Sequence, residues 1–130
     1  MQEWVKKFMD IRGYLPYLLI TFGGFSGAAL RYVIDSFVVT LEGTLLVNTI
    51  GCFFLGVFMY ESIYFGVFSR NTRFFFAVGV IGSFTTFSAL TVQTFQAGPV
   101  IGLLNLAANL VLGLIGIFGG RHFILYQRGI

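Results

Sequence analysis

Long apolar stretches alternate with short polar connections along this chain. The longest stretch, residues 74–120, contains no charged residue. As one helix it would be about 70 Å long, more than twice the thickness of a bilayer's hydrocarbon core. It must therefore reverse once, and we expect the turn at Gln96-Ala97-Gly98-Pro99. The pattern predicts an all-α membrane protein: a single four-helix transmembrane domain over residues 1–130, with a short interfacial helix over 1–12 and spans over about 13–34, 43–64, 74–96 and 99–124.

Composition and charge agree with this interpretation. Charged residues make up 10% and hydrophobic residues 57% of the 130 residues. Seven of the eight basic residues fall on one side of the predicted helices: Lys6, Lys7, Arg12, Arg70, Arg73, Arg121 and Arg128. Because cytoplasmic loops are enriched in Lys and Arg, we expect a multi-pass plasma-membrane protein with both termini in the cytoplasm, if it inserts in one orientation. The net charge of +3 then reflects topology, and no nucleic-acid partner is expected.

The third predicted span contains an unusual run of small and hydroxylated residues, Gly82-Ser83-Phe84-Thr85-Thr86-Phe87-Ser88. In hydrocarbon every backbone polar group must be paired internally, so a helix break is tolerated only where it faces protein or a cavity. Gly82 and Ser83 favour such a break. The hydroxyl groups and aromatic rings beside it favour a small-ion site.

An anion that loses its water needs replacement hydrogen-bond donors along its route. Candidate donors are Asn48, Asn109, Ser88 and Thr91, and the ring edge of Phe87 carries partial positive charge. Exposed carbonyls at a helix break could hold a buried cation. An alternative for the asparagines is bonding between helices, their most frequent use in membranes. Arg31, inside the first span, either lies at the mouth of an anion path, holds a helix end, or snorkels to the interface.

Several other classes of protein lack their required residues in this sequence. The acidic residues, Glu3, Asp10, Asp35, Glu42 and Glu61, all lie at or outside span ends. A proton-coupled exporter would need a carboxylate inside the membrane. No nucleophile–base pair, metal cluster or phosphate loop is present, so an enzyme is not expected. A non-conducting membrane subunit remains an alternative, although it would have no use for the hydroxyl cluster of the third span.

Three motifs, one in each of the first three spans, carry a family resemblance. They are Gly23-Gly24-x-x-Gly27-Ala28-x-x-Arg31-Tyr32, Gly43-Thr44-Leu45-x-Val47-Asn48-x-x-Gly51 and Gly79-x-x-Gly82-x-x-Thr85-Thr86-Phe87-Ser88. With these motifs the chain resembles the Fluc/CrcB fluoride channels along essentially its whole length. The resemblance implies passive fluoride export that reduces fluoride toxicity, through an antiparallel dimer with two pathways at the subunit interface.

The same resemblance implies roles for individual residues. The backbone carbonyls of Gly82 and Thr85 would hold a central sodium ion that is not transported. Asn48, Phe87 and Ser88 would line the fluoride route, and Asn109 would take the polar position of the fourth span.

The chain departs from the family pattern at three places. It has Phe87-Ser88-Ala89-Leu90 where the family usually shows Phe-Ser-Thr-Phe, Gln93 where a glutamate is common, and Asn105 where a tyrosine is frequent. Leu90 thus stands where the family pattern has its second phenylalanine. We do not assign the role of that ring to Phe84, because helical spacing is unreliable across a break. Together with the one-sided basic residues, these departures suggest a further hypothesis. The chain would pair with a homologous partner of opposite orientation, as a partly degenerate subunit of a heterodimeric channel.

Overall fold

The computed structural model describes residues 11–38 and 40–129. All regular structure in these residues is helical, and four helices are long and apolar enough to cross a membrane, as predicted. The elements are α2 (Ile11–Phe37), α3 (Leu41–Tyr64), α4 (Arg70–Arg73), η1 (Phe74–Ile81), α5 (Gly82–Phe84), α6 (Ser88–Gln96) and α7 (Pro99–Arg128). The interfacial helix predicted over 1–12 lies, except for its last two residues, outside the described part of the chain.

The turn expected before the last helix is present. α6 ends at Gln96, Gly98 has a φ of 81°, and Pro99 is the first residue of α7. A positive φ suits glycine, and proline fits the first helical position because its missing N–H would have no partner there. At the other end of α7, Gly129 adopts a left-handed conformation that closes the helix. Local chemistry therefore determines both ends of the longest helix.

The third span is not a uniform α-helix. Its η1 segment is π-helical, and the N–H of Gly82 donates to the carbonyl of Ala77 five residues earlier. Such wide turns are rare and often lie near functional sites. The apolar pattern of residues 74–81 did not reveal this feature. Such a pattern does not distinguish an α-helix, whose N–H groups bond the carbonyl four residues earlier, from a π-helix, in which they bond the carbonyl five residues earlier.

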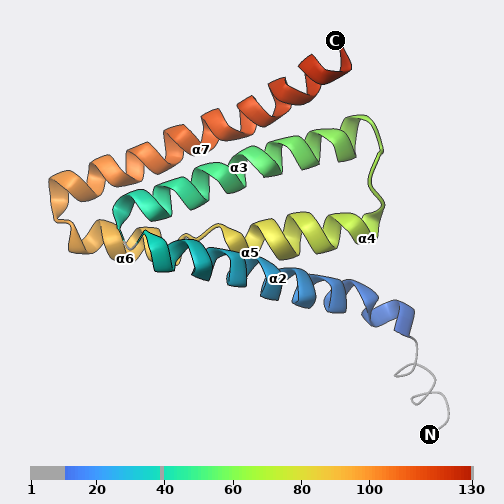
Figure 1. The fold of residues 1–130 in the computed structure, drawn as a ribbon, viewed down its shortest axis with the longest axis horizontal. Helices are drawn as coiled ribbons and strands as arrows, with labels where there is room; N and C mark the ends of the chain where they lie inside the picture. The colour runs from blue at the N-terminus through green and yellow to red at the C-terminus, as the bar shows by residue number, and fades with distance from the viewer. Residues whose placement is uncertain (1–10, 39, 130) are drawn as a thin grey trace, which may run out of the picture.

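Two pairs of helices make the closest contacts, α3 with α7 and α2 with η1 and α5 (Figure 1). Glycines allow both. The Cα positions of Gly23 and Gly27 in α2 face the carbonyl groups of Phe75 and Val80, and Gly120 in α7 faces the carbonyl of Phe53. Small residues let helix backbones approach closely where lipid provides no hydrophobic driving force. A further glycine of α3, Gly51, faces the side chains of Phe84 and Thr85, so α3 also lies beside the third span.

Candidate polar site at the interruption of the third span

The helical backbone of the third span is interrupted at residues 85–87. α5 ends at Phe84, Thr85 is extended with φ −72° and ψ 155°, and α6 begins at Ser88. The N–H and the hydroxyl of Thr85 both bond the carbonyl of Ile81. The interruption therefore brings the carbonyl end of one helical segment to the amide end of the next. Carbonyls at a helix end favour cations, and amides at a helix start favour anions.

Asn48 of α3 satisfies the backbone of the interruption. Its Nδ2 donates to the carbonyl of Thr86 at 3.0 Å, and its Oδ1 accepts from the N–H of the same residue at 2.8 Å. The side-chain amide thus pairs with a peptide group as a neighbouring strand would. The Thr86 hydroxyl in turn accepts from the N–H of Ala89 at 3.2 Å and caps the start of α6. A non-helical segment can persist here because its polar groups have partners.

The contact of Asn48 continues into a chain of amides, which we call the amide ladder: Asn48, Asn109, Asn105 and Thr94. Asn48 Nδ2 also donates to Asn109 Oδ1 at 3.0 Å. Asn109 Nδ2 donates to the carbonyl and to the Oδ1 of Asn105, at 3.0 and 3.2 Å. Asn105 Nδ2 donates to Thr94 Oγ1 at 3.2 Å. The ladder links α3, α7, α6 and the interruption. The asparagines therefore bond neighbouring helices, which was the alternative to a role as anion donors.

These bonds bear on the predicted anion donors. The Nδ2 atoms of Asn48 and Asn109 each donate to two protein oxygens. An anion could use either side chain only by replacing one of these acceptors. Thr91 is likewise engaged, because its hydroxyl bonds the carbonyls of Phe87 and Ser88 at 2.6 and 3.1 Å. That these residues line an ion route stays a prediction.

Most of the predicted site residues surround one cavity of about 270 Å³. Its wall is mostly apolar but includes the amide and hydroxyl side chains of the site, and we call it the polar recess after these groups. Its lining includes Gly82, Thr85, Phe87, Asn48 and Asn109. The Ser88 hydroxyl lies beside this cavity, 3.3 Å from the hydroxyl of Thr86, which is one of the lining residues. Thr91 is not among the lining residues.

Sequence reasoning gave no site role to Thr86 or Thr94. Thr86 appears in the third motif and lines the recess, and Thr94 ends the ladder. The contact of Thr94 with Asn105 could have been predicted from the sequence, because the two residues lie on either side of the turn at Gly98-Pro99, on helices that run antiparallel. For Thr86 only the fold supplies the partner.

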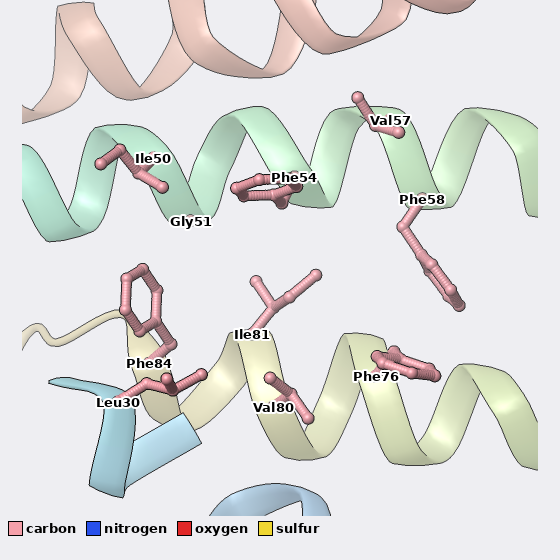
Figure 2. A pocket seen from close by; sticks show the side chains of 10 residues that line it. All are labelled: Leu30, Ile50, Gly51, Phe54, Val57, Phe58, Phe76, Val80, Ile81 and Phe84. Carbon is pink, nitrogen blue, oxygen red and sulfur yellow. The ribbon is translucent and has the colours of Figure 1, made fainter. Parts of the chain in front are cut away.

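The two aromatic residues of the run lie in different surroundings. Phe87 lines the polar recess and is 71% exposed. Phe84 instead lines an apolar cavity of about 320 Å³ between α3 and the third span, where its ring lies below Ile50 and near Leu30 (Figure 2). In the single chain, the two rings therefore do not share a cavity.

Arg31 reaches the interruption from α2. Its Nη1 lies 3.4 Å from the carbonyl oxygen of Thr85, and its side chain is half-buried. Of the roles considered above, this contact fits a cation that holds a helix end. The same carbonyl is one of the two predicted to hold sodium. The described residues contain no cluster of three His, Cys, Asp or Glu side chains that could bind a metal, so a cation at this place would depend on carbonyl oxygens.

Comparison with known proteins identifies the family. A family model described as CrcB-like protein, Camphor Resistance (CrcB), matches residues 18–121. The chain belongs to the CrcB-like family. Among its relatives is the fluoride-specific ion channel FluC 1 of Methanospirillum hungatei, 51% identical over 110 residues that cover 85% of this chain and 79% of the relative. FluC 2 of Methanosarcina mazei is 45% identical over 82% of this chain and 85% of its own length. FluC of Thermotoga maritima is 35% identical over 82% and 91%.

Of the positions at which this CrcB-like chain was noted to depart from the family pattern, Leu90 and Asn105 lie at the site. Leu90 is 4% exposed and lines the polar recess. Asn105 is 8% exposed and is a member of the amide ladder. Gln93 has a buried Oε1 that accepts no hydrogen bond from the described residues. Two of the positions noted above as departures therefore belong to the polar recess or to the amide ladder.

Proposed function

We propose that this chain forms a fluoride-specific channel of the plasma membrane that lets fluoride leave the cell passively. The observation that carries the proposal is the interruption at residues 85–87, which opens onto the polar recess within a stretch of 47 uncharged residues. A membrane helix gains nothing from such a break unless the exposed groups have a task. The names of the FluC relatives supply the ion.

Three kinds of group at or beside the recess suit a small, strongly hydrated anion. The amides at the start of α6 form the positive end of that helix, although the N–H of Ala89 among them is already bonded to the Thr86 hydroxyl. The Ser88 hydroxyl and the ring edge of Phe87 lie beside them, and Phe87 is largely exposed. These groups would replace water around fluoride without binding it as tightly as a fixed positive charge would.

The carbonyls of Gly82 and Thr85 are the groups that would hold a structural sodium ion. Both residues line the recess, and carbonyl oxygens at an unwound segment suit this cation. A bound sodium ion would supply positive charge that lowers the barrier to an anion. The guanidinium of Arg31 contacts the Thr85 carbonyl and adds positive charge at this place, so a sodium ion bound there would have to share or replace that contact.

A second subunit is part of this proposal. The side chains of the proposed fluoride route, Phe87, Ser88 and Thr91, are exposed in the single chain. In a membrane, a single chain would therefore present these side chains to lipid. We propose that an antiparallel partner covers them, either a second copy or a homologue of opposite orientation. A homologue would account for the one-sided basic residues and for the departures at Ala89, Leu90 and Gln93, and a second copy is the partner if the chain conducts by itself.

Ion efflux from liposomes tests the proposal. Liposomes loaded with fluoride or chloride and carrying the purified chain should release fluoride rapidly and no chloride, as followed with ion-selective electrodes. Phe87→Ile should abolish the release. Phe95→Ile is the matched control, since Phe95 is 89% exposed on α6 but does not line the recess, and it should conduct normally.

The alternative outcomes are separable. Equal release of both anions would overturn the fluoride assignment. If folded protein releases neither anion by itself but releases fluoride once an oppositely oriented homologue is added, the chain works only as half of a heterodimer. Silence in both cases would support a non-conducting subunit.

A further inference from the structure

An apolar groove lies between α3 and α7, near the ends at which these helices finish. We call it the α3–α7 groove, and it holds about 400 Å³. Its walls include Leu55, Met59 and Ile63 of α3 and Ile117 and Phe118 of α7, and Arg121 lies at its rim. The two helices run side by side to this end of the molecule (Figure 1). The groove is separate from the polar recess, with which it shares only Leu55.

The rim of the groove lies at the depth of lipid headgroups. Arg121 is about 33 Å along the helix axis from Pro99, the first residue of α7, at 1.5 Å per residue. Tyr60, beside it on α3, is about 28 Å from Leu41. Hydrocarbon is about 30 Å thick, so both side chains reach the interface when the other helix ends lie at the opposite surface. Tyr60 and Tyr64 at this level match the interfacial enrichment of tyrosine.

Arg121 keeps its positive charge available. Its guanidinium carbon lies 5.5 Å from the centre of the Tyr60 ring, and no carboxylate of the described residues forms an ion pair with it. Glu61, the acidic residue next to Tyr60, is already paired with Arg128 through contacts of 3.0 and 2.6 Å. The rim is therefore cationic, and a guanidinium binds phosphate oxygens well.

We propose that the α3–α7 groove binds an anionic phospholipid, with its phosphate on Arg121 and an acyl chain along the apolar walls. The shape and charge of the groove together specify an amphiphile with a negative head. A free phosphate ion would leave the apolar walls without a partner. A zwitterionic lipid such as phosphatidylcholine also offers a phosphate to Arg121, but its choline cation cancels the net negative charge that the cationic rim attracts. Basic pockets between membrane helices are known to accept such headgroups.

Lipid retention by the purified chain tests the proposal. Protein in neutral detergent is incubated with phosphatidylglycerol or with phosphatidylcholine of the same acyl chains, and bound lipid is counted by native mass spectrometry. We expect phosphatidylglycerol to be retained preferentially, and Arg121→Gln to weaken that retention roughly fivefold. The matched control is Arg70→Gln, because Arg70 is also exposed and stacks on a ring, 5.4 Å from Phe74, but does not line the groove. Its retention should equal that of the wild type.

A second variant separates the groove from charge alone. Ile63→Trp fills the groove at a residue that is 61% exposed, and it leaves every charge in place. It should reduce phosphatidylglycerol retention without changing the oligomeric mass. Unchanged binding in Arg121→Gln would overturn the proposal, as would an equal loss in Arg70→Gln or complete displacement of the lipid by inorganic phosphate. A change of oligomeric mass in Ile63→Trp without any loss of lipid would show that a second copy covers the groove.

Discussion

Replacing Asn48 by leucine should destabilise the chain strongly, although the two side chains are similar in size. Asn48 makes three hydrogen bonds: to the carbonyl and the N–H of Thr86, and to Asn109 Oδ1. Hydrogen bonds between membrane helices average about 0.6 kcal/mol each and reach about 1.7 kcal/mol. Three of them therefore amount to about 2 to 5 kcal/mol. The upper end applies where water cannot reach the peptide of Thr86, which is 9% exposed.

The neighbouring residue provides a matched control. The hydroxyl of Thr49 is buried and has no hydrogen-bond partner among the described residues. Thr49→Val keeps the shape and removes only that hydroxyl, so the free energy of unfolding should change by less than about 0.5 kcal/mol or increase. Both variants lie in the same turn of α3 and face the same detergent environment.

Unfolding can be followed through helix content and through the single cysteine. Sodium dodecyl sulfate is titrated into mixed micelles while far-ultraviolet circular dichroism and maleimide labelling of Cys52, half-buried in α3, are recorded. Asn48→Leu should unfold at clearly lower detergent fraction than wild type, and Thr49→Val at about the same fraction. Equal midpoints for the two variants would refute the structural role of Asn48 in holding the interruption.

Two further comparisons test the packing of α3 against α7. Gly120→Ala should destabilise the chain by several kcal/mol, because the added methyl group would overlap the carbonyl of Phe53. Gly119→Ala should be tolerated, because the nearest atom to its added methyl group is 3.8 Å away. Thermal unfolding of both variants tests the difference in stability. For the pair of Glu61 and Arg128, whose side chains are 15% and 38% exposed, a double-mutant cycle with Glu61→Gln and Arg128→Gln should give a small coupling that 0.5 M salt weakens. A coupling that salt leaves unchanged would contradict the prediction.

Residues near one another in the chain carried most of what could be predicted about the fold. The four spans follow from apolar length, because a helix crosses hydrocarbon only where about 20 residues in succession avoid charge. The turn at Gly98-Pro99 follows from the conformations those two residues favour. The run from Gly82 to Ser88 pointed to the right part of the third span, because so many hydroxyls in mid-span are unusual for a lipid-facing helix. The break was expected at Gly82 and Ser83, however, which are helical in α5, and it is residues 85–87 that leave the helix.

The sequence by itself thus determined a membrane protein with four helices and a polar cluster in the third. Only the tertiary structure decided how that cluster is used: Asn48 bonds the peptide of Thr86, Phe84 and Phe87 line different cavities, and Arg31 contacts the Thr85 carbonyl. The physical reason is that a side-chain amide can donate to any acceptor within reach. Which acceptor is within reach depends on how helices from distant parts of the chain face one another, and the close approach of glycine-bearing faces sets that arrangement.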